Sequence, residues 1–215
     1  MTYLQLVNDV LVRLREETVS TVSETTYSSL IGKFVNDAKR AIEDAYEWNI
    51  LGTTVVVSTV ASTSSYALTG AGQKFRVADV INDTNNTGMK NIPFVNMNRY
   101  LNFGTVTNGV PLYFAFDGVD ASYDTKVSLF PIPDGVYSLR FSLVVPQATL
   151  SSDATVALVP SELIVQSAYA RALVERGEDG GLSSSEAYLL YKSMLSDYIS
   201  MEATRYPEFG SFEAV

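Results

Sequence analysis

Three aspartates in the segment DGVDASYD are the first residues whose type and spacing could do chemistry. Asp117, Asp120 and Asp124 are spaced by three and four residues. Hard cations such as Ca²⁺ bind several carboxylate oxygens, but the EF-hand order D-x-D-x-D-G is absent and the spacing matches no calcium loop. The segment is more typical of a solvated hairpin turn, so we predict no metal site here.

A second candidate is the glycine-rich segment GAGQK at residues 70–74. A phosphate-binding loop requires the order G-x-x-x-x-G-K-[ST] followed by a helix, whereas strand-forming residues follow here, so we predict a turn. Carboxylates are numerous enough for glycoside hydrolysis, which needs two acids held about 5–10 Å apart, but no spacing in the sequence selects a pair.

The composition excludes much of the remaining chemistry, because the chain contains no His and no Cys. Catalytic triads with His, thiol nucleophiles, zinc or haem ligation by these residues, and disulfides are therefore impossible. An enzyme would have to use carboxylates, lysine, tyrosine or magnesium. We predict no enzymatic activity, no catalytic residue, no cofactor and no bound metal.

Acidic residues outnumber basic ones, 24 to 15, which gives a formal net charge of −9 and a pI near 4.5. This balance argues against a protein that binds nucleic acid by neutralising phosphates. Acids exceed bases in residues 1–50 and 151–215, whereas residues 51–150 are neutral. The first 30 residues do not pair a basic start with a long apolar run, so we expect neither a secretory signal nor a membrane span.

Apolar residues at helical spacing predict two helices at the start of the chain. The first covers residues 2–15, with Thr2 as its N-cap. The second covers about residues 26–47, and Trp48 follows it as a core anchor at the helix end. The predicted apolar side of the second helix consists of Tyr27, Leu30, Ile31, Phe34, Ala38, Ile42 and Ala45.

From Gly52 the apolar period changes from helical spacing to alternation, which is typical of strands. The clearest strand covers residues 137–145, where Leu139, Phe141 and Leu143 should point to a core. Other predicted strands lie at 53–60, 64–69, 75–81, 92–95, 112–116 and 127–129. Turns are predicted at Gly70-Ala71-Gly72, Asn108-Gly109, Asp117-Gly118 and Pro133-Asp134-Gly135. This pattern fits a small antiparallel sandwich or barrel.

Helical spacing returns near Pro160, where Pro and an acid open a helix that is apolar on nearly every side. Such a helix needs neighbours on most sides, and Gly177 or the Gly180-Gly181 pair ends it. A last helix opens with an S-x-x-E capping box that starts at Ser183. Its predicted apolar stripe consists of Ala187, Tyr191, Met194, Leu195, Tyr198 and Met201.

The two helices at each end are too small to form separate stable domains, so we pair them. The predicted fold class is α+β: a helical bundle made from the N- and C-terminal helices, with an antiparallel β sandwich or barrel inserted between them. Residues 1–50 and 151–215 form the bundle, and residues 51–150 form the β module. The final stretch RYPEFGSFEAV is predicted to be an extended tail.

Charged residues alternate in sign along the second predicted helix, which is typical of a solvated face or a subunit contact. The basic members are Lys33, Lys39 and Arg40, and the acidic members are Asp37, Glu43 and Asp44.

Two further stretches carry exposed aromatic residues in the prediction. Residues 82–108 contain eight asparagines mixed with Tyr100 and Phe103, which fits either a recognition surface or long hairpin loops. In the tail, Phe209 and Phe212 follow a helix-breaking proline, which favours docking of the tail into a neighbouring protein.

The order of these parts resembles the head-to-tail adaptor proteins of tailed bacteriophages, also called connectors or gatekeepers. The resemblance runs from LVNDVLVRL in the first helix, through a β insert that ends in SLFPIPDGVYSLRFSLVVP, to LVPSELIVQSAYARALVERGED and a long acidic helix. Its most specific pieces are the PIPDG-x-YSLRF hairpin at 131–141 and the VPSELIVQSAYARAL helix at 159–173. Neither piece is a catalytic motif.

The resemblance implies a structural virion protein that forms a ring of twelve copies in the neck between capsid and tail. Such a ring docks on the portal protein, gives the tail or nozzle an attachment platform, and encloses a channel through which genomic DNA passes without specific binding. On this sequence the resemblance assigns portal contact to about residues 183–215, including Arg205, Tyr206, Phe209 and Phe212. It assigns tail contact to loops around 82–109, with Asn85, Asn86, Asn98, Tyr100 and Phe103 as candidate contact residues.

A head-to-tail interface that closes into a ring needs two different surfaces on one subunit, and a chain with two modules supplies them. Assembly would take place in the host cytoplasm, and no membrane partner is expected. Two other interpretations stay open: another tail structural protein of the tube, nozzle or baseplate, and a carbohydrate-binding or hydrolysing β module of a phage tail.

Overall fold

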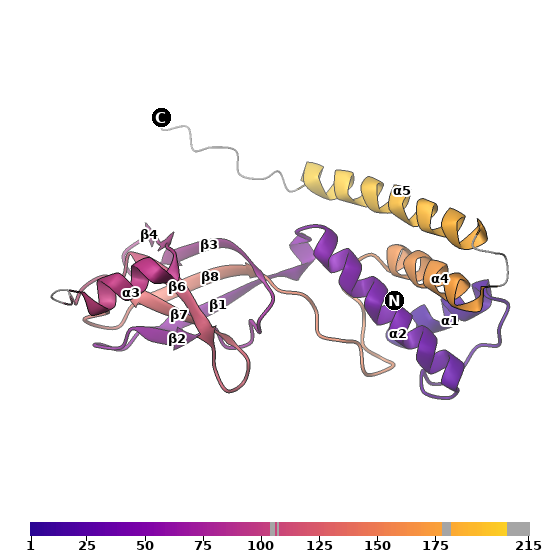
Figure 1. Cartoon of the computed structure of the whole chain (residues 1–215), viewed down its shortest axis with the longest axis horizontal. Helices are drawn as coiled ribbons and strands as arrows, with labels where there is room; N and C mark the ends of the chain where they lie inside the picture. Colours follow the sequence, from indigo (N-terminus) through magenta and orange to yellow (C-terminus); the bar gives the residue numbers. More distant parts are fainter. Residues whose placement is uncertain (104–105, 107, 178–181, 206–215) are drawn as a thin grey trace. The chain divides into compact units, whose positions relative to one another are not determined.

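The structure is a computed structural model of the 215-residue chain, and it describes residues 1–103, 106, 108–177 and 182–205. The chain divides into two units, and Figure 1 labels most of their helices and strands. The helical unit contains residues 1–51 and 146–215, and the β unit contains residues 52–145. Helices from the two ends of the chain flank an inserted β module, which confirms the α+β prediction. Within the described ranges, no helix combines the length and the apolar character needed to cross a membrane.

The helical unit is arranged around α4, which contacts α1, α2 and α5. The side chains of Leu163, Ile164 and Ala168 on α4 are fully buried. The prediction that this nearly all-apolar helix has neighbours on most sides is therefore confirmed. The helices of the unit are α1 (Tyr3–Arg13), α2 (Thr26–Ala45), the short 3-10 helix η1 (Asn49–Leu51), α4 (Ser161–Arg176) and α5 (Leu182–Arg205).

Local sequence signals set the ends of these helices. Thr2 is the N-cap of α1, where its hydroxyl accepts a hydrogen bond from the Gln5 amide at 3.3 Å and its own amide donates to Gln5 Oε1 at 2.9 Å. Gly177 ends α4 in the left-handed conformation, with φ 63°. Trp48 is 2 % exposed, and its indole N–H donates to the carbonyl of Ile42 at 2.7 Å, so it anchors the end of α2 as predicted.

The buried face of α2 is rotated from the predicted one. Phe34 is only half-buried and Ala45 is exposed, whereas Val35 is fully buried. The rotation follows from Gly32, on which the ring of Tyr3 packs so closely that a Cβ at this position would lie 2.4 Å from the tyrosine hydroxyl oxygen. The predicted stripe omitted this glycine because it has no apolar side chain.

Two predictions for α5 are also wrong. Ser183 is not the N-cap, because the helix already includes Leu182. Met201 is 54 % exposed rather than part of a buried stripe. The hydroxyl of Tyr198 donates to the carboxylate of Glu162 at 2.8 Å, in the first turn of α4. The residues of α5 after Tyr198 therefore extend beyond the start of α4, which leaves Met201 uncovered.

The β unit consists of two four-stranded sheets, with strand orders β1-β8-β3-β4 and β2-β7-β6-β5. β1 pairs with β8 so that Gly52 lies opposite Val144. One core is shared by the two sheets, with Leu139, Phe141 and Leu143 of β8 buried in it as predicted. The strands are β1 (Gly52–Ser58), β2 (Ser65–Ala67), β3 (Arg76–Asn82), β4 (Thr87–Gly88), β5 (Lys90–Asn91), β6 (Tyr113–Val119), β7 (Thr125–Phe130) and β8 (Ser138–Val144).

The sheets differ from the predicted antiparallel sandwich in one pair, because β5 and β6 are parallel. Asp117 and Gly118 do not form a turn: they lie inside β6, where the register against β7 shifts between Phe116 and Val119. Gly118 has φ 66°, which glycine adopts without strain, so this pair forms a bulge in the strand.

A helix replaces the strand predicted at residues 92–95. α3 (Phe94–Asn102) begins directly after Pro93 and packs against β6 and β7. Met97 is the residue of α3 that is fully buried. The prediction took a short apolar run for a strand, a distinction that periodicity alone does not make over so few residues.

Candidate interaction surfaces

The predicted tail-contact residues lie on two different elements of the β unit. Asn85 and Asn86 are exposed between β3 and β4, and Asn86 has φ 52°, a left-handed conformation that asparagine tolerates well. Asn98, Tyr100 and Phe103 lie on α3 and at its C-cap, and α3 covers strands of the other sheet. The structure thus brings the second group together on one helix and leaves the asparagine pair on a separate turn.

The exposed residues of α3 and its C-cap include large apolar side chains as well as four polar ones, Asn96, Asn98, Arg99 and Asn102. Phe103 is 78 % exposed and Val95 is 62 % exposed. The ring of Tyr100 stacks on the ring of Phe130, with centroids 4.9 Å apart and planes 19° apart, so β7 fixes its position. Apolar groups gathered on a surface mark a binding site more often than scattered ones do. We call Phe94, Val95, Tyr100 and Phe103 the α3 patch.

The predicted portal-contact residues begin at the end of α5. Arg205 is the last residue of this helix and forms an ion pair with Glu202. The Glu202 side chain is buried, and its Oε1 accepts a hydrogen bond from the Asn49 amide at 3.2 Å. The helix end is therefore held against the segment that follows α2. Tyr206, Phe209 and Phe212 lie outside the described residues.

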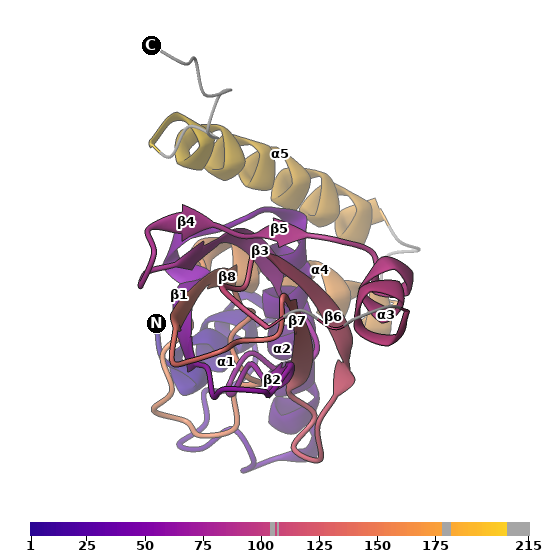
Figure 2. The same ribbon diagram turned by 90° about the vertical axis from the view of Figure 1, so that its left-hand side faces the viewer.

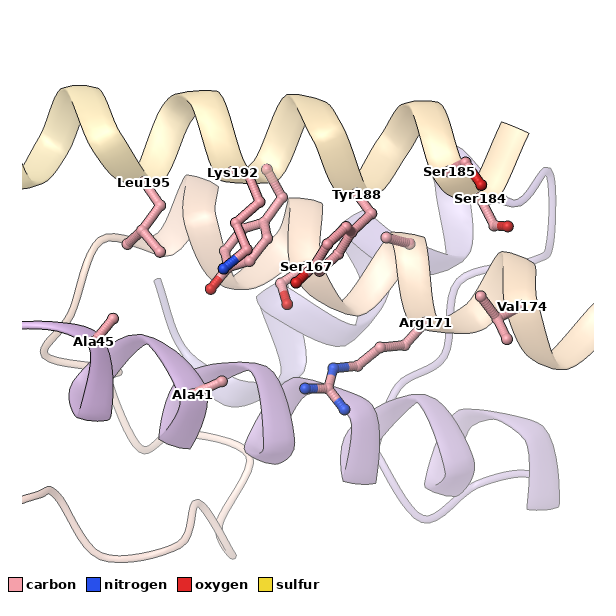
Figure 3. Close-up of a pocket in the computed structure, with 12 residues that line it drawn as sticks. Ala41, Ala45, Ser167, Arg171, Val174, Ser184, Ser185, Tyr188, Lys192 and Leu195 are labelled. Atoms are coloured by element: carbon pink, nitrogen blue, oxygen red, sulfur yellow. The ribbon is translucent and has the colours of Figure 1, made fainter. Parts of the chain in front are cut away.

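A groove that the sequence did not predict lies between α2, α4 and α5, and Figure 3 shows it in close-up. Its volume is about 400 Å³. Small side chains form much of its lining, including Ala41, Ala45 and Ser167, and none of the described residues that line it is acidic. Arg171 projects into it from α4 and Lys192 from α5. Neither cation forms an ion pair within the part of the chain that the structure describes.

Two tyrosines of α5, Tyr191 and Tyr198, have a raised pKa. Burial raises the pKa of the Tyr191 hydroxyl above its ordinary value of 10.0. The hydrogen bond that Tyr198 donates to the Glu162 carboxylate raises its pKa as well. Lys192 lies over the ring of Tyr188, with its ammonium nitrogen 5.6 Å from the ring centroid.

The prediction of a solvated charged face on α2 is correct for Lys33 and Arg40 but wrong for Lys39 and Glu43. The last two side chains are buried, and Lys39 Nζ lies 3.0 Å and 3.1 Å from the two carboxylate oxygens of Glu43. Lys39 also donates to the carbonyl of Gln147 at 2.6 Å, while the Gln147 amide donates to Glu43 Oε1 at 3.2 Å. The pair therefore ties α2 to the chain where it leaves the β unit.

The aspartates of the 117–124 segment have structural partners. Asp124 accepts hydrogen bonds from the amides of Gly70 and Gly72 at 3.0 and 2.9 Å, and Asp120 accepts from the amides of Ser122 and Asp124. The glycine-rich segment is thus a turn, and β3 follows it rather than a helix. Among the described residues, no three metal-ligating side chains gather into a cluster.

The described surfaces offer exposed apolar area, cations and hydrogen-bonding groups, which are features of surfaces that associate with other molecules. A family model described as SU10 adaptor protein matches residues 1–210. A comparison with curated proteins gives no match. Because the family match covers nearly the whole chain, the resemblance to phage adaptors is confirmed, and the chain belongs to the SU10 adaptor protein family.

Proposed function

We propose that this protein joins the head of a tailed bacteriophage to its tail. Twelve copies form a closed ring in the neck of the virion, after assembly in the host cytoplasm. The C-terminal segment from Arg205 onward binds the portal protein, and the β unit binds the tail or nozzle protein. Genomic DNA passes through the central channel without specific binding.

The observation that carries this proposal is the match of the adaptor family over residues 1–210. Two features of the chain support the assignment of partners. The α3 patch is an exposed apolar surface on the β unit, and the end of α5 leads into a segment that contains Phe209 and Phe212. Each of the two partners thus has a separate surface, one on each unit, as an adaptor requires.

Deletion of residues 205–215 tests the portal contact. Burial of an aromatic side chain contributes about 1.5–3 kcal/mol, so loss of Phe209 and Phe212 should weaken portal binding by about a hundred-fold or more. The truncated chain should keep the far-ultraviolet circular dichroism of the full chain, since the described helices end at Arg205. Portal binding at wild-type affinity by the truncated chain would overturn the assignment.

Substitution of the α3 patch tests the tail contact. Tyr100→Ala combined with Phe103→Ala should abolish tail attachment and leave portal binding unchanged. A matched control is Tyr123→Ala, which removes a 68 % exposed aromatic side chain from the turn between β6 and β7. If tails attach equally well to the α3 variant and to the control, the tail contact lies elsewhere.

The acidity of the chain suits a channel for DNA. Exposed carboxylates occur on each of the four long helices of the helical unit, at Asp9, Asp37, Glu175 and Asp197 among others. Like charge repels phosphate, so acidic groups on the channel wall would keep DNA from binding during packaging and ejection. A map of the assembled ring that shows a basic channel wall would contradict this part of the proposal.

A further inference from the structure

Two sheet edges of the β unit border the same groove. β1 is the edge strand of one sheet and β2 is the edge strand of the other. A groove of about 440 Å³ lies between them, lined by Thr54 to Val57 of β1 and by Tyr66, Ala67 and Thr69 on the β2 side. On the opposite side the chain passes directly from one sheet to the other, from β4 through the buried Met89 to β5. In Figure 2 the labels β4 and β5 lie together at the top of the unit. The sandwich is thus closed along one side and open at the β1–β2 groove.

The hydrogen bonds show which backbone groups of β1 point out of its sheet. The Thr59 amide donates to the Tyr137 carbonyl at 2.9 Å, and these two residues continue the β1–β8 register. In an antiparallel pair every second residue bonds to the partner strand, so Val55 and Val57 bond to β8. The amides and carbonyls of Thr54 and Val56 therefore point outward.

The same reasoning applies to β2. The Leu68 amide donates to the Thr125 carbonyl at 2.9 Å, and the Leu129 amide donates to the Ser64 carbonyl at 2.8 Å. Ser65 and Ala67 lie between these bonded positions, so their backbone groups point away from β7. No backbone hydrogen bond of these outward groups is found within the described residues. The hydroxyl oxygen of Ser65 is also buried without a hydrogen-bond partner in that part of the chain.

The β1 edge lacks the features that keep strands from pairing with other chains. Natural edge strands are protected by charged side chains, prolines or bulges. The sequence between Glu47 and Lys74 contains no Asp, Glu, Lys, Arg or Pro. β1 pairs with β8 in continuous register over all seven of its residues, and Val56 on it is 56 % exposed. An edge of this kind is suited to being covered by another strand.

The floor of the groove determines what such a strand must look like. Val55 and Tyr66 are partly buried and pack against the core of the β unit, and Val57 belongs to that core. Side chains alternate between the two faces of a strand, so an added strand would direct every second side chain toward this floor. Those side chains must be apolar. An uncharged rim also gives no site for pairing with a charged residue of the added strand.

We propose that the β1–β2 groove binds an extended segment of the tail-side partner, which adds as a β strand to the edge of β1. The segment is about seven residues long, uncharged, and apolar at alternate positions. The unpaired rows of amides and carbonyls identify an extended polypeptide as the ligand, because it alone presents matching groups at the same two-residue spacing. This inference rests on the proposed attachment of the tail to the β unit and adds a second contact to the α3 patch.

Hydrogen–deuterium exchange of the full chain tests the proposal in three states: alone, bound to portal, and in the tailed particle. Peptides that cover residues 52–58 and 65–67 should exchange at least about ten-fold more slowly in the tailed particle than in the other two states. Peptides from β8 should be protected in all three states, because both of its edges are paired. Unchanged exchange at β1 and β2 in the tailed particle would refute the inference.

The other outcomes separate this inference from the function on which it rests. Protection at α3 without protection at β1 would refute the strand addition and leave tail attachment to the β unit intact. Protection at neither element would refute both. Protection of β1 already in the portal-bound state would identify a second copy or the portal as the donor, and would also refute the tail-side assignment.

A pair of variants tests the same strand by function. Val56→Pro removes an amide that points outward and leaves the bonds to β8 in place, as prolines on edge strands do. It should reduce tail attachment by ten-fold or more and leave portal binding unchanged. Val56→Thr keeps the amide and a β-branched side chain, so tails should attach normally. Protection of β8 against exchange in both variants establishes that the β unit is folded, and normal tail attachment to the proline variant would overturn the proposal.

Discussion

Replacement of Lys39 by methionine should strongly destabilise the helical unit. Methionine has a similar length and helix propensity, so the change mainly removes the ammonium group. Three contacts are lost: two to the carboxylate of Glu43, at 3.0 and 3.1 Å, and one to the carbonyl of Gln147, at 2.6 Å. Glu43 would then be a buried carboxylate without its counter-charge.

The expected loss is about 3–5 kcal/mol in the free energy of unfolding, which is the range for a buried ion pair from which one partner has been removed. Gln147 still donates to Glu43 Oε1 at 3.2 Å, so the lower end of this range is the better expectation. The double variant Lys39→Met with Glu43→Leu should lose less than the single variant, because no unpaired charge remains. The Gln147 carbonyl loses its donor in both variants and the Gln147 amide loses its acceptor only in the double variant, so part of the loss remains.

Urea unfolding followed by tryptophan fluorescence measures these differences. Trp48 is the one tryptophan of the chain, and it is buried at the end of α2, so its emission reports on the helical unit. Lys33→Met on the exposed face of the same helix is the matched control and should change the stability by less than about 0.5 kcal/mol. A loss below about 1 kcal/mol for Lys39→Met, or a double variant less stable than the single one, would refute the reasoning.

Three further predictions concern the helical unit. Gly32→Ala should destabilise it by about 1–3 kcal/mol in urea unfolding, because the new Cβ would lie 2.4 Å from the hydroxyl oxygen of Tyr3. Gly177→Ala should cost about 1 kcal/mol in the same assay, because its φ of 63° strains any residue with a Cβ. The thermal stability of the unit should fall as the pH rises above 10.0, the ordinary pKa of tyrosine, and fall less in Tyr191→Phe. Burial raises the pKa of Tyr191 in the folded state, so ionisation above that pH favours the unfolded chain.

The chain offers controls for these variants. Gly88→Ala places a Cβ where no heavy atom lies within 4 Å, so it should leave the stability nearly unchanged. Wild-type stability of the Gly32 variant would mean that the ring of Tyr3 moves aside without cost. An alkaline melting curve of Tyr191→Phe that overlays that of the wild type would show that other groups cause the fall.

The sequence predicted the larger elements because each of them carries a regular signal. Helical spacing after the N-cap Thr2 located α1, and helical spacing before Gly177 located α4. Alternation of apolar and polar residues located β8. These signals act within a short stretch of chain, where spacing and backbone preference decide the local structure. The pairing of the two ends followed from a size argument, since two helices alone bury too little surface.

The candidate surfaces were harder to predict, because they depend on contacts between distant residues. In the sequence, Lys39 and Glu43 resemble members of a solvated charged face. In the structure, the backbone carbonyl and amide of Gln147, about a hundred residues away, hydrogen-bond to them. Their spacing of four residues allows the pair but does not indicate that it is buried. The β1–β2 groove depends on which strands lie at the sheet edges, and strand order is not encoded in the alternation of any single strand.

The pairing of Gly52 with Val144 means that the chain enters and leaves the β unit on adjacent strands. An insertion whose two ends lie side by side adds little closure entropy to the domain that carries it, so its length and content are under weak constraint. Recombination at the two ends of the insertion would replace the β unit by another domain and leave the helical unit unchanged. Diversification of the β unit would then require no change in the helical unit.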